Sequence, residues 1–171
     1  MFSQNNNKSS GIDTIVAEIY KCSFDTISPF MLTIFNTISH TGIYPESWVS
    51  GVIVPMFKGG DSGNAKNYRD ITLINTIAKI YTQILLSRLT RWSTAHEILT
   101  DNQFGFQKRK STIDCIFLLH SIIQKTLNSR KKLKCAFIDL EKCFDKFNRY
   151  FIFQKLVNEN VSQEFIVASY V

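Results

Sequence analysis

The chain has 171 residues, 44% of them hydrophobic and 13% aromatic, and its 20 Lys and Arg against 14 Asp and Glu give a formal net charge of +6. This length and apolar content exclude a disordered chain and favour one domain with its own core. The polar start, MFSQNNNKSSG, has no apolar leader, and no apolar run approaches a membrane span of ~18 residues, so we expect an intracellular protein of the cytoplasm or nucleus without a membrane partner.

The first forty residues predict two helices. One is expected from Asp13 to about Tyr20, and another from about Pro29, where proline suits the first helical turn, to Ser39. The second helix has an apolar face made of Phe30, Ile34, Phe35 and Ile38.

A hairpin and a long helix are expected next. Residues 49–57 are typical of a strand that enters the glycine-rich turn 59–63, and a second short strand follows at 71–73. From Thr76 to His96, apolar residues recur at intervals of three and four, which predicts a core helix.

The last third alternates helices with one apolar strand. Ser111 and Asp114 have the spacing of a capping box, with Asp in place of Glu, and predict the start of a helix. A basic loop then leads into residues 135–138, a continuously apolar run of the kind expected for a strand buried on both faces. Asn148 is a candidate N-cap for a helix that ends near Asn158. This order of elements predicts a mixed α+β fold.

The excess of positive charge is local. Between Lys108 and Lys134, eight basic residues are accompanied by Asp114 alone among acidic residues, which we interpret as one basic patch. Such a patch favours a polyanion, most plausibly nucleic acid, although a solvated loop is the alternative.

The cysteines suggest neither a metal site nor a redox site. Cys22, Cys115, Cys135 and Cys143 form no C-x-x-C pair and no zinc-like spacing, so we expect reduced core residues.

Asp139 follows the apolar run 135–138 directly. A carboxylate at the end of a buried strand is costly unless a hydrogen bond, a cation or a metal compensates its charge, and hard oxygen ligands suit Mg²⁺. From the residues alone, a structural cap or salt bridge and a metal site both remain open.

Five segments, taken in order, resemble the reverse transcriptase domain of non-LTR (LINE-like) retrotransposons. Residues 6–21 (NNKSSGIDTIVAEIYK) resemble the family's N-K-S-P-G-x-D-G-I opening, and residues 42–61 its G-x-x-P-x-x-W and P-x-x-K-x-G-D block. Residues 67–89, beginning NYRDITL, resemble the Y-R-P-I-S-L segment with its helix, and residues 101–114 (DNQFGFQKRKSTID) the Q-x-G-F-x-x-x-x-S-T segment. FIDLEKCFD, residues 137–145, resembles F-x-D-x-x-x-A-F-D. Each match alone is weak, but five in family order are specific.

The resemblance implies a polymerase right-hand fold, of which the chain holds the fingers and the first part of the palm. Residues 1–130 would be a fingers-like region with a basic hairpin and helices, and residues 131–171 the start of the palm. The implied parent activity is RNA-templated DNA synthesis. Its partners would be an RNA template, a DNA primer, deoxynucleoside triphosphates and Mg²⁺, with Mn²⁺ as an alternative.

The resemblance also implies roles for single residues. Asp139 would be the catalytic, metal-binding carboxylate, the backbone carbonyl of Leu140 a further metal ligand, and Asp145 a supporting residue behind them. The ring of Phe144 would clash with a 2′-hydroxyl and so favour deoxynucleotides, although a core aromatic is the alternative. The other candidates for nucleotide binding are Arg69, Lys58, Gln103, Gly105 and Phe106. The candidates for contact with nucleic-acid phosphate are Lys108, Arg109, Lys110, Arg130, Lys131 and Lys132.

Departures from the family pattern bear on activity. Thr14 and Arg109 stand where the family has glycine, Cys143 replaces an alanine, and Asp70 replaces the proline after Arg69, where it would compete with phosphate for the guanidinium. The family's second metal-binding element is an aromatic-x-Asp-Asp turn, and the chain has no Asp-Asp pair. We therefore expect a fragment that cannot polymerise alone. The alternatives are an RNA-binding remnant, a fragment of a group II intron-type reverse transcriptase, or a poorly folded piece without function.

Overall fold

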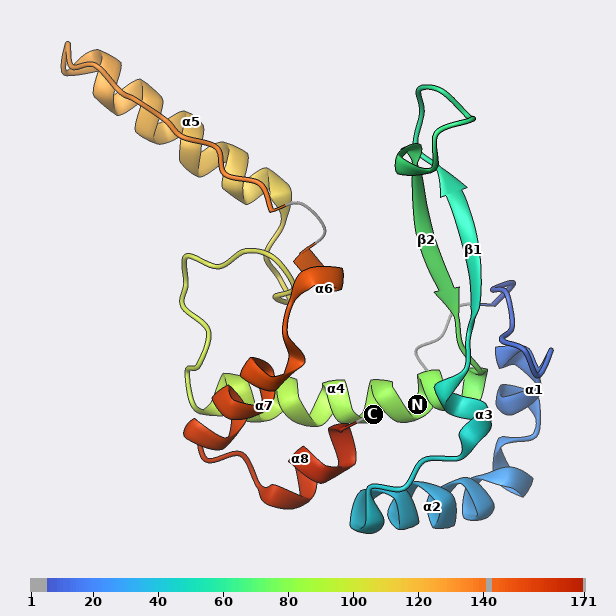
Figure 1. Ribbon diagram of the computed structural model, residues 1–171. Helices are drawn as coiled ribbons and strands as arrows, with labels where there is room; N and C mark the ends of the chain where they lie inside the picture. Colours follow the sequence, from blue (N-terminus) through green and yellow to red (C-terminus); the bar gives the residue numbers. More distant parts are fainter. Residues whose placement is uncertain (1–5, 141–142, 171) are drawn as a thin grey trace. The chain divides into compact units, whose positions relative to one another are not determined.

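The computed structural model describes residues 6–140 and 143–170, apart from the side chain of Asp145, as a mixture of helices and a small sheet (Figure 1). The elements are α1 (Ala17–Cys22), α2 (Phe24–Thr41), α3 (Glu46–Val49), β1 (Val52–Phe57), a 3₁₀ turn (Ala65–Asn67), β2 (Tyr68–Leu73), α4 (Thr76–Ala95), α5 (Thr112–Asn128), α6 (Cys143–Lys146), α7 (Arg149–Asn158) and α8 (Gln163–Ser169). This content agrees with the predicted α+β class. No helix within the described ranges is long and apolar enough to cross a membrane.

The chain divides into two compact units. The first consists of Met1–Leu89 together with Arg149–Val171, and the second of Thr90–Asn148. The expected division into fingers at 1–130 and palm at 131–171 follows family motifs rather than compactness, and it stays a prediction.

The elements with strong local signals form where the sequence predicts them. α4 matches the predicted core helix to within one residue at its C-terminal end. At the start of α5, the Ser111 side chain accepts a hydrogen bond from the Asp114 N–H, and the Asp114 carboxylate accepts one from the Ser111 N–H at 2.7 Å. The capping box is therefore confirmed, with Asp114 at the N3 position that Glu usually occupies.

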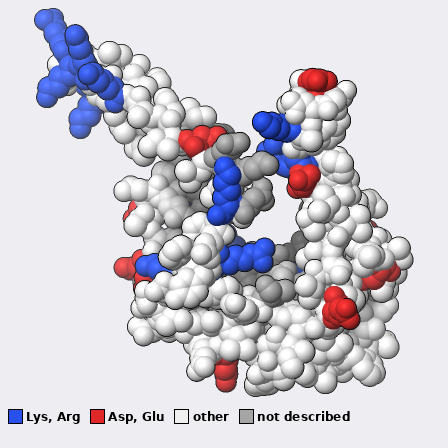
Figure 2. Space-filling view, in the orientation of Figure 1, with Lys and Arg blue, Asp and Glu red and all other residues white. Residues whose placement is uncertain are grey.

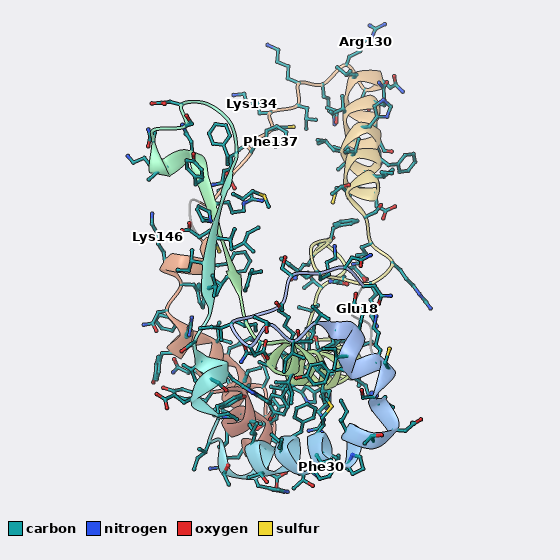
Figure 3. All side chains as sticks on the ribbon, turned by 90° about the vertical axis from the view of Figure 1, so that its right-hand side faces the viewer. Glu18, Phe30, Arg130, Lys134, Phe137 and Lys146 are labelled. Atoms are coloured by element: carbon teal, nitrogen blue, oxygen red, sulfur yellow. The ribbon has the colours of Figure 1, made fainter. Side chains whose placement is uncertain are left out.

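The start of α2 was predicted wrongly, and its buried face was predicted correctly for Phe35 and Ile38 alone. α2 begins at Phe24, so Pro29 lies inside the helix rather than in its first turn. The buried face is offset from the predicted one and consists of Met31, Phe35 and Ile38, whereas Phe30 is 70% exposed and points into solvent (Figure 3). Ile34 is also exposed. Apolar residues occupy more than one face of α2, and packing selects one of them.

An aromatic cluster from four segments forms the core of the first unit. Phe35 of α2, Trp48 of α3 and Tyr81 of α4 have ring centroids 5.2 to 6.1 Å apart, and Tyr44 joins them from the loop before α3. The Tyr44 hydroxyl donates a hydrogen bond to the carbonyl of Ala168 in α8. Burial raises the pKa of Tyr44, and the neighbouring Tyr81 adds to the shift. The cluster thereby joins α2, α4 and α8 in one core.

The segment before α1 is fixed to the start of α4 by buried polar groups. The Asp13 N–H donates to Asn75 Oδ1, and the Thr76 hydroxyl donates to the carbonyl of Ile15 at 2.6 Å. Asn75 also donates to the carbonyl of Ser47 at 2.9 Å, and both Asn75 and Thr76 are almost fully buried. These bonds hold the main chain of Asp13 and Ile15 against the start of α4.

Gly11, the glycine of the opening motif, passes directly against this junction. A Cβ at Gly11 would lie 2.5 Å from the backbone nitrogen of Asn75 and 2.6 Å from the carbonyl carbon of Ile74. Because both are backbone atoms that cannot rotate away, we expect Gly11→Ala to lower the free energy of unfolding by roughly 1–3 kcal/mol. Gly63→Ala is the matched control, since its Cβ would first meet Asp61 Oδ1 at 3.4 Å. Urea unfolding of both variants measures the loss of stability. Equal unfolding midpoints would show that the junction can accommodate a Cβ at Gly11.

The predicted strand at 135–138 does not form. Residues 131–140 have no regular structure, and Phe137 and Ile138 are 85% and 87% exposed. A buried strand needs a neighbour to pair with, and in the described ranges β1 and β2 pair with each other alone. The prediction of core cysteines fails with it: Cys22, Cys115, Cys135 and Cys143 are free thiols, as expected, but all are exposed.

Candidate functional site

Lys58 and Arg69 lie on the same face of the β1–β2 hairpin. The antiparallel register pairs Met56 with Arg69, and the Lys58 N–H extends the ladder by donating to the carbonyl of Asn67 at 2.8 Å. Side chains alternate along a strand, so residues 56, 58 and 69 share one face. Lys58 and Arg69 are therefore diagonal neighbours across the hairpin, with their Cα atoms about 7–8 Å apart. The two cations predicted to bind nucleotide are both exposed.

Asp70 lies on the opposite face of the hairpin. It follows Arg69 within β2 and pairs with Pro55. Since successive strand residues point to opposite faces, the Asp70 carboxylate is directed away from the guanidinium. The expectation that Asp70 competes with phosphate for Arg69 is therefore wrong, because residues adjacent in a strand lie on opposite faces.

An aromatic pair on that opposite face, which the sequence analysis missed, holds the end of the hairpin. The rings of Phe57 and Tyr68, a cross-strand pair, have centroids 5.3 Å apart. The Tyr68 hydroxyl donates to the carbonyl of Ser62 at 3.0 Å, and the Asn67 amide donates to the carbonyl of Asp61 at 2.8 Å. The available signal was an aromatic residue at the turn-proximal end of each strand. These contacts order the tip next to Lys58.

In the second unit, the loop from Asp101 to Lys110 carries the predicted residues Gln103, Gly105 and Phe106. The Gln103 side chain donates to the carbonyl of Gly105 at 3.4 Å. Phe106 has the left-handed φ of 61° and its side chain is 95% exposed. An aromatic ring held almost wholly in solvent cannot contribute to a core, and it is available to a ligand.

Phe144 of α6 meets Phe106 within the same unit. Their ring centroids lie 6.5 Å apart with perpendicular planes, and Phe144 is 83% exposed. The two residues are far apart in sequence and come from two different motifs, yet they form one exposed aromatic pair. The alternative reading of Phe144 as a core aromatic does not fit this exposure.

Asp139 and Leu140 lie on the irregular segment that follows α5, and both are exposed. Figure 3 shows Phe137 on this segment, which leads away from Arg130 and Lys134. Carboxylate and carbonyl oxygens are the ligands that Mg²⁺ prefers, and it is commonly held by one or two carboxylates with substrate phosphates, so the two donors fit the ion in kind. In the part of the chain that the structure describes, no three His, Cys, Asp or Glu side chains gather to hold a metal. Asp145, the predicted supporting residue, has its side chain outside the described residues.

The basic run is two clusters rather than one patch. Lys108, Arg109 and Lys110 precede α5, Lys125 lies in its last turn, and Arg130, Lys131, Lys132 and Lys134 follow it. A helix of 17 residues separates its ends by about 25 Å. Figure 2 shows Lys and Arg side chains gathered at the far end of the second unit, where α5 ends. The prediction of a single patch is therefore wrong, because α5 separates residues that are close in sequence.

Comparison with known proteins gives a consistent family assignment. Residues 58–171 match the family described as reverse transcriptase (RNA-dependent DNA polymerase). The chain is 27% identical over 140 residues to a probable RNA-directed DNA polymerase from transposon BS of Drosophila melanogaster, covering 81% of this chain and 16% of that protein. It is 26% identical over 147 residues to a probable RNA-directed DNA polymerase from transposon X-element of the same species, covering 84% and 16%. The RNA-directed DNA polymerase from mobile element jockey is 24% identical over 140 residues, covering 81% and 15%. The chain thus spans about a sixth of the length of these relatives.

Proposed function

Because the chain belongs to the reverse transcriptase (RNA-dependent DNA polymerase) family, we propose that it supplies the fingers and the first part of the palm of an enzyme that copies RNA into DNA. The resemblance to reverse transcriptases of non-LTR retrotransposons is confirmed, since the matched relatives are RNA-directed DNA polymerases of transposons and mobile elements. In this proposal the fingers extend over residues 1–130 and the palm begins within residues 131–171.

The observation that carries the proposal is the contact between Phe106 and Phe144. Each was expected at the nucleotide site on the basis of a separate motif, and their meeting in one compact unit supports a shared site. Phe144 would exclude a 2′-hydroxyl from the incoming sugar, and Phe106, Gln103 and Gly105 would lie beside the base and template. Exposed aromatic rings suit stacking on nucleobases.

Charged residues of each unit have proposed roles of their own. Arg69 and Lys58 would bind the triphosphate from one face of the hairpin, a task suited to a guanidinium. Asp139 and the Leu140 carbonyl would hold Mg²⁺, or Mn²⁺, with Asp145 supporting them. When bound, the metal would activate the primer 3′-hydroxyl and stabilise charge on the transferred phosphoryl group. RNA template, DNA primer and deoxynucleoside triphosphates are the proposed partners. With no Asp-Asp pair in its sequence, the 171-residue chain is proposed not to polymerise by itself.

The proposal is tested in a chimera in which this chain replaces the matched segment of the jockey RNA-directed DNA polymerase. We expect Arg69→Met to raise the KM for deoxynucleotides by about 10–100-fold, because a charge-assisted hydrogen bond is worth about 1.5–3 kcal/mol. The change in kcat should be smaller, since triphosphate binding is shared by the ground and transition states.

Asp70→Asn is the matched control for Arg69→Met. It changes a charge at the neighbouring position of β2 on the opposite face, so we expect the KM to stay within about twofold. A larger effect of Asp70→Asn than of Arg69→Met would overturn the assignment of the nucleotide face.

RNA binding without catalysis is the second candidate function, favoured by the exposed basic residues Lys108 and Arg109 before α5 and the exposed basic cluster 130–134 after it. It predicts that the chain binds single-stranded RNA with little sequence preference and that log affinity falls linearly with log salt. A salt titration of binding by the chain alone measures this. Salt-sensitive binding together with an inactive wild-type chimera would favour this function over polymerisation.

A further inference from the structure

The ammonium group of Lys110 is turned into its own loop rather than toward solvent. Lys110 Nζ donates hydrogen bonds to the main-chain carbonyls of Asp101, at 2.5 Å, and Gln103, at 3.3 Å. The same nitrogen lies 5.3 Å from the centroid of the Phe104 ring. Two carbonyls and an aromatic face therefore surround a cation that the sequence places in a basic run.

The main-chain carbonyls of Asp101 and Gln103, rather than the carboxylate of Asp101, hold the ammonium group of Lys110 in this position. Asp101 Oδ1 lies 3.8 Å from Lys110 Nζ, and the Asp101 side chain is fully exposed, so the ion pair contributes little. The Lys110 side chain itself is only 22% exposed. A hydrogen bond from a charged donor is among the stronger bonds available to a main-chain carbonyl.

The geometry closes the loop from Asp101 to Lys110 into a ring. The side chain of its last residue holds the carbonyls of its first and third residues, and the Gln107 amide adds a bond to the carbonyl of Thr100 at 3.3 Å. Within this ring, Phe106 and Arg109 have the left-handed φ values of 61° and 66°. Residues with a Cβ adopt this conformation at a cost, so the loop needs contacts that hold it.

We propose that Lys110 is a positioning residue that fixes the shape of the loop carrying Gln103, Gly105 and Phe106, and that it does not contact nucleic-acid phosphate. The exposed Lys108 and Arg109 are the members of the run that face outward. The positioning role of Lys110 rests on contacts within this loop and does not depend on the proposed function. Only the identity of the ligand that the loop binds rests on the proposed function.

Lysine labelling of the wild-type chain tests the position of the ammonium directly. With limiting acetic anhydride and peptide mass spectrometry, we expect Lys110 to react about fivefold more slowly than Lys108, since the reagent must first displace the bonds to two carbonyls. Equal rates would overturn the proposal. This measurement needs no variant and no bound nucleic acid.

Variants then separate positioning from phosphate contact. Lys110→Met should speed hydrogen exchange of residues 101–107 by about threefold or more, Lys110→Arg should restore slow exchange, and Lys108→Met should leave it unchanged. In single-stranded RNA binding, Lys108→Met should reduce the salt slope by about 0.7, and Lys110→Met should leave it unchanged. A reduced slope with unchanged exchange in Lys110→Met would overturn the proposal. If the wild-type chain binds no RNA, the proposed function loses support, while labelling and exchange still decide the role of Lys110.

Discussion

Asp139→Asn in the chimera with the jockey polymerase is expected to reduce RNA-templated incorporation of deoxynucleotides by about 10³-fold or more. The substitution keeps the shape of the side chain but removes its negative charge, and a metal-bound carboxylate at a phosphoryl-transfer site is worth several kcal/mol, of which each 1.36 kcal/mol is a factor of ten in rate. Primer extension on an RNA template in Mg²⁺ measures the loss.

Substitution of Asp139 should not disturb folding, because this residue is exposed and lies outside any helix or strand. Glu97→Gln is the control, since it neutralises another exposed carboxylate of the same unit. RNA binding by Asp139→Asn should be retained, which distinguishes loss of catalysis from loss of folding. Incorporation equal to that of the wild-type chimera would refute the catalytic role of Asp139. Asp139-dependent incorporation by the 171-residue chain alone would refute its proposed inactivity.

The features that the sequence predicted well are those specified within a few residues. The start of α5 depends on Ser111 and Asp114, which lie within its first turn, and both hydrogen bonds of the box form. α4 depends on a 3.6-residue period sustained over five turns. Neither needs a distant segment to be in place, so a local pattern suffices.

The failures arise where three-dimensional geometry, rather than the composition of a segment, determines which residues meet. Residues 135–138 have the composition of a buried strand, but a strand forms only where another offers its backbone groups. The basic run has the composition of a patch, but α5 separates its ends. The competition expected between Asp70 and Arg69 failed because a strand sends neighbours to opposite faces. Composition predicts the secondary structure and environment that a segment favours, whereas the fold determines which other residues the segment contacts.

The backbone is left-handed at two positions where the sequence departs from the family pattern. Thr14 and Arg109, which replace family glycines, have φ values of 59° and 66°. Glycine adopts these values without steric cost, whereas a residue with a Cβ loses about 1–2 kcal/mol. At both sites a residue with a Cβ therefore stands in the conformation that glycine adopts most readily.

Tyr81→Ala is expected to lower the free energy of unfolding of the first unit by about 3–5 kcal/mol, the usual cost of removing a buried aromatic ring. Tyr81 is 1% exposed and contacts Phe35, Tyr44 and Trp48, so no side chain can fill the space without leaving its own contacts. Urea unfolding followed by tryptophan fluorescence measures the change. Thr82→Ala is the control on the next, exposed position of α4 and should change the stability by less than about 0.5 kcal/mol.

Tyr81→Phe separates the ring from its hydroxyl. The hydroxyl lies 3.1 Å from Ser39 Oγ and neighbours Tyr44, whose own hydroxyl holds the carbonyl of Ala168. Tyr81→Phe should therefore cost only about 1 kcal/mol, the net value of a hydrogen bond, and leave the ring contacts in place. A cost equal to that of Tyr81→Ala would mean that the hydroxyl chain from Ser39 to Ala168, rather than aromatic packing, joins α8 to the core. Because the hairpin that carries Lys58 and Arg69 belongs to this unit, loss of the core should also weaken the proposed nucleotide binding without any change at Lys58 or Arg69.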